Sequence, residues 1–144
     1  MIGPTATRAE GRPAFSMWLA AWAGGALIGV ANGVAREATY GRWVKAQTAH
    51  LLSTLVGIAA LAGYFWMLHG RWPISTNGDA FRIGGAWLGM TVTFEFAFGR
   101  LVAQQSWEEL LSDYNLRRGR TWPLVLGWIA VGPVATRGLH QRLD

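Results

Sequence analysis

One acid inside an apolar stretch is the residue of this sequence best suited to chemistry. Glu95 interrupts the apolar segment 83–103 and precedes Ala103 by eight residues. At ~1.5 Å per residue, a helix would place this carboxyl about 12 Å below its end. A carboxylate at that depth is costly unless it is paired, protonated or facing water. Glu95 is therefore a candidate for handling a proton, an ion or a ligand.

Polar residues on neighbouring apolar segments are the candidate partners of Glu95. Arg100 follows Glu95 by five residues and would point ~140° away from it on a helix, so the partner should come from another segment. An ion pair with Arg36, or a hydrogen bond with Asn32 or His50, would fix only the helix register. Proton or ion handling and the binding of a headgroup, pigment or quinone are the alternatives. The candidate cluster comprises Asn32, Arg36, Glu37, His50, Ser53, Glu95 and Arg100.

Signatures of catalysis and of metal binding are absent from the sequence. There is no HExxH, GxSxG, Walker or dinucleotide-binding pattern, and no cysteine for a disulfide, a thiolate ligand or a nucleophile. We therefore predict no catalytic residue, no metal site and no cofactor. His50 and His69 lie near predicted helix ends and leave open a pigment or haem ligand, although one histidine is not a site. His140 is expected to lie in a solvated tail.

The elements that must position these residues are predicted to be membrane-spanning helices. Hydrophobic residues make up 51% of the 144 residues and charged residues 15%, well below the ~25% typical of a soluble domain. Two uncharged stretches, 13–35 and 46–70, each exceed the ~20 residues that cross a bilayer. Two weaker segments follow, one containing Glu95 and the other short with Pro133. The predicted spans are 14–35, 47–69, 83–103 and 121–137.

These spans predict an all-α fold, a membrane-embedded four-helix transmembrane bundle. A flexible leader would occupy residues 1–13, a single domain residues 14–139, and a tail residues 140–144. A cleavable signal peptide is the rival interpretation of the first span, but its 22 apolar residues exceed the ~7–15 of a signal core. We expect a multi-pass protein of the bacterial cytoplasmic (inner) membrane with both termini on the same side. Loops rich in Lys and Arg usually face the cytoplasm. The side of the termini carries six basic residues and the other side seven, so the orientation of the protein in the membrane stays open.

Small residues are predicted to bring the helices close together. Gly25, Gly29 and Gly33 recur every four residues and share one face of the first helix. Gly85 and Gly89 form a second pair on the third helix, on a different face from Glu95. Such patterns are common at helix interfaces in membranes, whatever the function.

A short amphipathic surface helix is predicted between the third and fourth spans. Ser106 and Glu109 form a capping-box pattern. The apolar face that follows has helical spacing, which favours a helix lying on the membrane surface or across the mouth of the bundle. Its residues are Trp107, Leu110, Leu111 and Tyr114.

Charge and aromatic residues indicate membrane partners. The net charge of +5 is spread over loops and helix ends without a basic stripe, so nucleic-acid binding is not expected. Contact with membrane lipids, and with other membrane-protein subunits or with copies of itself, is expected instead. Most of the nine tryptophans fall near predicted interfaces and would form an aromatic belt, namely Trp18, Trp43, Trp66, Trp72, Trp107 and Trp122.

Several short strings resemble a widespread group of small uncharacterised bacterial membrane proteins, over roughly residues 25–130. The strings are Asn32–Gly33 with Arg36 and Glu37, Ala49–His50, Glu95–Gly99, Ser106–Leu111, the AspTyrAsn at 113–115 and the TrpProLeuVal at 122–125. The resemblance implies a four-helix bacterial membrane protein and implies no activity.

Two functions agree with these observations, and a third is weaker. The first is a non-enzymatic accessory or structural subunit of a membrane complex or homo-oligomer. The alternative is a small proton- or cation-coupled transporter or channel that uses Glu95. The weaker alternative is an enzyme acting on lipid or quinone.

Overall fold

The structure, a computed structural model, describes residues 7–112, 114, 115, 117 and 120–144, with side chains described from residue 14 onward. Helices and their connections make up all of the described chain, and no strand occurs in it. The all-α prediction is therefore confirmed. In chain order the elements are α1 (Thr7–Ala38), the 3₁₀ turn η1 (Tyr40–Arg42), α2 (Ala46–Arg71), α3 (Asn77–Leu101), α4 (Trp107–Ser112) and α5 (Trp122–Leu143).

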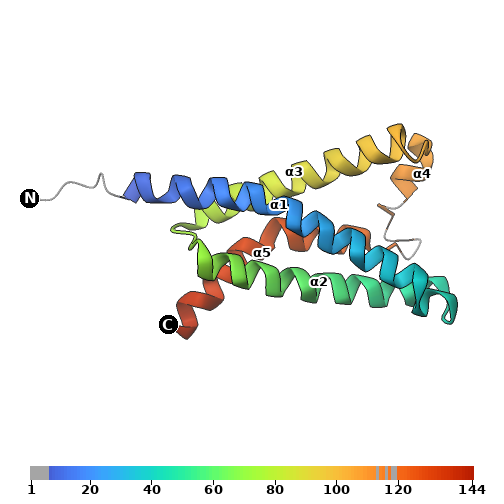
Figure 1. Cartoon of the computed structure of the whole chain (residues 1–144), viewed down its shortest axis with the longest axis horizontal. Coiled ribbons are helices and arrows are strands. Elements are labelled where there is room, and N and C mark those ends of the chain that lie inside the picture. Colours follow the sequence, from blue (N-terminus) through green and yellow to red (C-terminus); the bar gives the residue numbers. More distant parts are fainter. Residues whose placement is uncertain (1–6, 113, 116, 118–119) are drawn as a thin grey trace, which may run out of the picture.

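Each of the long helices packs against two others. α1 contacts α2 and α3, and α5 also contacts α2 and α3, with the most extensive contact between α3 and α5. The start of α1 and the end of α5 lie toward the same end of the molecule (Figure 1). At the opposite end α3 diverges from α2 and carries α4 with it (Figure 1).

Several helix ends differ from the predicted spans. α1 begins at Thr7, so residues 7–13 of the predicted leader are helical, while residues 1–6 lie outside the described part. α5 continues to Leu143, so the predicted tail at 140–144 is helical except for its last residue. α3 ends at Leu101, and Gln104 just beyond it has a positive φ of 52°.

Thr76 caps the start of α3 and is joined to Asp79 by two hydrogen bonds. The Thr76 hydroxyl accepts a hydrogen bond from the Asp79 backbone N–H at 3.0 Å and donates one to the Asp79 carboxylate at 2.9 Å. Thr76 is thus the N-cap residue. The cap satisfies an N–H group that has no partner within the helix.

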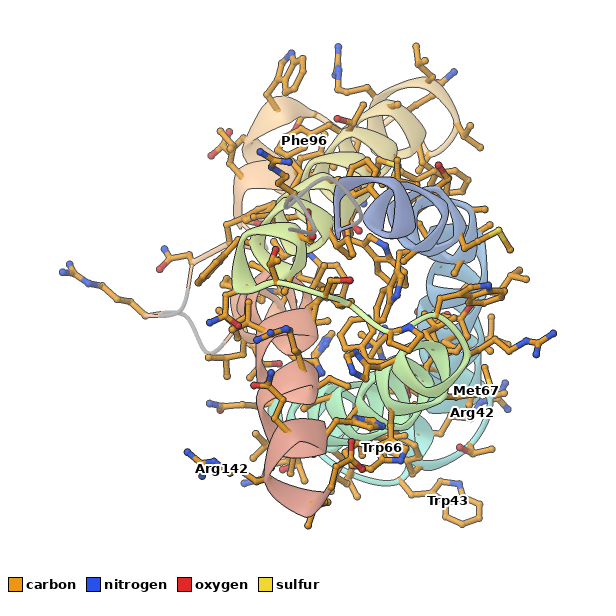
Figure 2. The ribbon with its side chains drawn as sticks, turned by 90° about the vertical axis from the view of Figure 1, so that its left-hand side faces the viewer. Arg42, Trp43, Trp66, Met67, Phe96 and Arg142 are labelled. Carbon is orange, nitrogen blue, oxygen red and sulfur yellow. The ribbon has the colours of Figure 1, made fainter. Side chains whose placement is uncertain are left out.

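Aromatic residues form the core at the end where α1 begins. Trp18, Phe65 and Trp87 are at most 1% exposed, and the ring centroids of Phe65 and Trp87 lie 5.2 Å apart. The Trp87 indole donates to the Trp18 carbonyl at 2.8 Å, and the Trp18 indole donates to the Trp72 carbonyl at 3.0 Å. The prediction that Trp18 belongs to an interfacial belt is therefore wrong, because its polar atom is satisfied inside the core. Trp43, by contrast, is 87% exposed and points away from the helices (Figure 2).

Some glycines hold the helices together and others face open space. A Cβ on Gly25 would lie 2.6 Å from the Trp87 ring, and one on Gly84 would collide with the Ala130 carbonyl of α5. Gly85 and Gly89, predicted to pack α3, have no neighbouring atom within 4 Å of such a Cβ. Within the molecule α3 therefore packs on α5 through Gly84, the residue next to the predicted Gly85.

Two stretches of helix, Ala14–Ala38 and Ala46–Arg71, are long and apolar enough to cross a membrane by length and composition. Among the described residues, α3 and α5 do not reach the same apolar composition. Glu95 and Arg100 lower it in α3.

Candidate functional site

A cavity lies between the long helices near the end where α1 finishes and α5 begins. Its volume is about 280 Å³, and all of α1, α2, α3 and α5 contribute to its lining. The divergence of α3 in this region (Figure 1) separates it from α2, so the aromatic core of the other end does not continue here. We call this space the inner cavity.

The inner cavity brings together most of the predicted polar cluster. Its lining includes Asn32, Arg36, His50, Ser53 and Glu95, which come from α1, α2 and α3. Their positions along the helices place them at a similar depth, which is why helical geometry applied to the sequence could group them.

Two members of the predicted cluster lie elsewhere. The side chain of Glu37 is 78% exposed and forms an ion pair with the neighbouring Arg36 at 3.6 Å. Arg100 is exposed; its guanidinium donates to the Gln105 carbonyl at 2.8 Å and lies 5.0 Å from the centre of the Trp107 ring. Arg36 therefore has Glu37 as its ion-pair partner, where the sequence suggested Glu95.

Glu95 is held by two donors that sequence reasoning did not assign to it. The Tyr114 hydroxyl and the Trp122 indole donate to the same carboxylate oxygen, Oε2, at 2.8 Å and 2.9 Å. Tyr114 also stacks on Phe96, with ring centroids 5.7 Å apart. The sequence pattern instead predicts Tyr114 on the apolar face of a surface helix and Trp122 in an interfacial belt. The only available signal was that both side chains carry a hydrogen-bond donor.

A second, outer cavity of about 550 Å³ adjoins the inner one. It extends outward between the end of α3, α4 and the segment before α5, where Leu110, Tyr114 and Arg120 line it. Glu95 lies where the two meet. The two cavities share Val30, Arg36, His50, Phe94, Glu95, Thr121 and Trp122.

Polar contacts between helices surround the inner cavity. The Asn32 side-chain amide donates to the Ser53 carbonyl at 2.7 Å, which joins α1 to α2. The Trp22 indole donates to the Thr91 hydroxyl at 3.0 Å, which joins α1 to α3. Such interhelical hydrogen bonds each contribute about 1 kcal/mol in a membrane protein.

Aromatic rings and glycines form the apolar part of the inner cavity. Trp22, Trp87 and Phe94 belong to its walls. Gly29 and Gly33 also line it, and a Cβ at either position would meet no atom within 4 Å. These glycines, predicted to pack the first helix, therefore leave room beside it, and of the three only Gly25 makes close helix packing.

The predicted surface helix is present as the short α4, and it covers part of the outer cavity. The capping box is confirmed, because Glu109 accepts from the Ser106 backbone N–H at 2.9 Å and the Ser106 hydroxyl accepts from Glu109 at 3.1 Å. Leu110 is buried against Gly99 of α3. Trp107 and Leu111 remain 56% and 59% exposed.

The other two histidines lie at the opposite end of the molecule. His69 is buried, and its Nδ1 accepts from the Ile74 backbone N–H at 3.4 Å. His140 is half-buried in α5 and stacks on Trp66, with ring centroids 3.7 Å apart, so the prediction of a solvated tail residue is wrong. In the part of the chain that the structure describes, no group of three or more His, Cys, Asp or Glu side chains could hold a metal ion.

Comparison with known proteins finds no matching family model, curated protein or solved structure. The resemblance to a group of small bacterial membrane proteins therefore stays a prediction.

Proposed function

We propose that this chain is a non-enzymatic integral membrane protein of the bacterial inner membrane, acting as an accessory or structural subunit of a larger complex or of a homo-oligomer. The observation that carries the proposal is the exposure of α1 and α2. In the most apolar 18-residue stretch of each helix, only 17% of the residues of α1 and 33% of those of α2 are buried inside the molecule. A core helix of a water-soluble protein would be mostly buried, whereas a lipid-facing helix exposes its apolar side chains.

The outward side chains of α3 and α5 support a bundle of four membrane-embedded helices. Phe94 and Phe98 of α3 are 44% and 50% exposed, and Leu124 and Val131 of α5 are 49% and 50% exposed. Glu95, the acid within α3, accepts two hydrogen bonds from inside the molecule, as an intramembrane acid requires. Four crossings would leave both termini on one side of the membrane.

An outward small-residue face supports a role in assembly. Gly85 and Gly89 are exposed on α3 with open space beside them, and they would allow a second helix to approach closely. Co-purification from native membranes in a mild detergent tests this role. We expect a stoichiometric partner or a homo-oligomer that Gly85→Leu with Gly89→Leu dissociates. Gly63→Leu, at another open glycine of α2, is the control. A species that stays monomeric and alone would contradict the subunit role.

The position of Glu95 favours proton- or cation-coupled transport as a second candidate function. Its side chain lines both the inner and the outer cavity, so a proton or cation could pass by it from one to the other. If Glu95 transports, Glu95→Gln should leave the folded protein intact and abolish flux in proteoliposomes. If Glu95 only joins the helices, the same change should lower thermal stability in detergent and wild-type flux should be absent.

A further inference from the structure

We propose that the two adjoining cavities form a binding site for one anionic phospholipid of the surrounding membrane. Arg36 and Arg120 would bind its phosphate in the outer cavity, and an acyl chain would enter the inner cavity. The proposal rests on the membrane placement proposed above. The outer cavity, at about 550 Å³, is within the ~300–1,000 Å³ range of ligand sites in proteins.

The charges around the outer cavity favour an anion. Arg36 and Arg120 both line it, and Glu95 is the one acidic residue among its described lining residues. The neutral donors Tyr114 and Trp122 leave the charge of Glu95 in place, and Glu37, the ion-pair partner of Arg36, is 78% exposed and does not line the cavity, so two guanidinium groups line the cavity with one carboxylate. Guanidinium groups present a planar set of donors that matches the oxygens of a phosphate.

The position of the two arginines matches the depth of a headgroup. Arg36 precedes the end of α1 by two residues, and Arg120 precedes the start of α5 by two residues. Both side chains are only partly exposed, that of Arg36 by 23%. Basic pockets at this level between membrane helices are typical sites for anionic lipid headgroups.

The apolar surroundings explain why the ligand would be a lipid rather than free phosphate. Val30 of α1 and Phe94 and Phe98 of α3 line the outer cavity while being 55%, 44% and 50% exposed. They form an apolar opening between α1 and α3 toward the acyl chains. The inner cavity behind it is walled by Trp22, Trp87 and other apolar residues, which an acyl chain can contact and a phosphate ion cannot.

Native mass spectrometry of the full-length protein in a neutral detergent tests the ligand class. The probes are phosphatidylglycerol, phosphatidylcholine with the same chains, and inorganic phosphate. We expect phosphatidylglycerol to bind at least about tenfold more tightly than phosphatidylcholine, and inorganic phosphate neither to bind nor to displace it. Equal affinity for the two lipids would overturn the proposal that the ligand is anionic. Displacement by inorganic phosphate would overturn the role of the acyl chain.

Matched variants locate the binding. Arg36→Gln and Arg120→Gln should each weaken phosphatidylglycerol binding by about tenfold, and should weaken binding of phosphatidylcholine, whose choline offsets the phosphate charge, by less. The control is Arg82→Gln, whose side chain is 78% exposed and lies near the start of α3, at the opposite end. Binding that is unchanged by both cavity variants, or equally reduced by the control, would overturn the site.

A cavity-filling variant tests the acyl chain. A Cβ at Gly33 would meet no atom within 4 Å, so Gly33→Leu would extend into the inner cavity and should reduce phosphatidylglycerol binding, whereas Gly63→Leu should not. If the wild-type protein requires detergent but does not prefer phosphatidylglycerol to phosphatidylcholine, this site is refuted and the membrane placement is not. Detergent-free solubility of the wild type would refute the membrane placement itself.

Discussion

The indole of Trp122 donates to the carboxylate of Glu95 at 2.9 Å, so the first residue of α5 is tied to the interior of α3. Tyr114 reaches the same oxygen from the segment between α4 and α5. One partly buried acid thus holds two residues, Tyr114 and Trp122, that line the outer cavity. This arrangement explains how α3 can diverge from α2 and still hold the connection to α5 in place.

Removing one donor to Glu95 should destabilise this connection. Tyr114→Phe keeps the ring that stacks on Phe96 and deletes the hydroxyl, so we expect a loss of about 1 kcal/mol in folding free energy. Thermal unfolding in detergent measures it. Tyr40→Phe is the matched control, because the Tyr40 hydroxyl is buried with no hydrogen-bond partner in the described structure. Equal stability of the two variants would contradict a stabilising role of the hydrogen bond between Tyr114 and Glu95.

Adjacent glycines of α3 should respond in opposite ways to alanine. Gly84→Ala would push a methyl group into the Ala130 carbonyl and should destabilise the protein by about 1–3 kcal/mol. Gly85→Ala meets open space and should be neutral or stabilising by up to about 1 kcal/mol, because alanine favours helix. Thermal unfolding of both variants distinguishes them. A larger loss at Gly85 would mean that the α3–α5 interface is misplaced.

Helical periodicity was sufficient to predict the all-α class and to group Asn32, Arg36, His50, Ser53 and Glu95 at one level. It was not sufficient to predict which glycine meets another helix. Gly84 and Gly85 differ by ~100° around the axis, and only the position of α5 decides between them.

The partners of Glu95 were not predictable because they depend on tertiary structure. Tyr114 follows the end of α4 and reaches Glu95 only because α4 folds back onto α3. Its spacing from Trp107 fits an amphipathic helix equally well, so the sequence pattern alone places it on the apolar face of a surface helix. Trp18 illustrates the same limit, since a tryptophan near a helix end can serve either an interface or a core.

Arg137 of α5 should control the order of the connection between α2 and α3. Its guanidinium donates to the carbonyls of Ile74 and Ser75 at 3.1 Å and 2.8 Å, and to the side chain of Asn77 at 2.6 Å. Arg137→Gln removes these hydrogen bonds, so we expect faster amide hydrogen exchange at residues 72–76 and a stability loss of about 1–3 kcal/mol. Arg142→Gln, at an exposed position of the same helix, is the control. Unchanged exchange in Arg137→Gln would contradict this role.

The proposal that the apolar helix faces lie in lipid is tested most directly by cysteines introduced one at a time, because the sequence contains no cysteine. Leu27, Leu55 and Val131 are 70%, 57% and 50% exposed, while Trp43 is 87% exposed in a connection between helices. In native membranes, we predict that cysteines at the first three positions resist a charged, water-soluble maleimide and react with it only after denaturation in detergent, and that a cysteine at Trp43 reacts in the intact membrane. Rapid labelling of all four by the charged reagent would contradict the account.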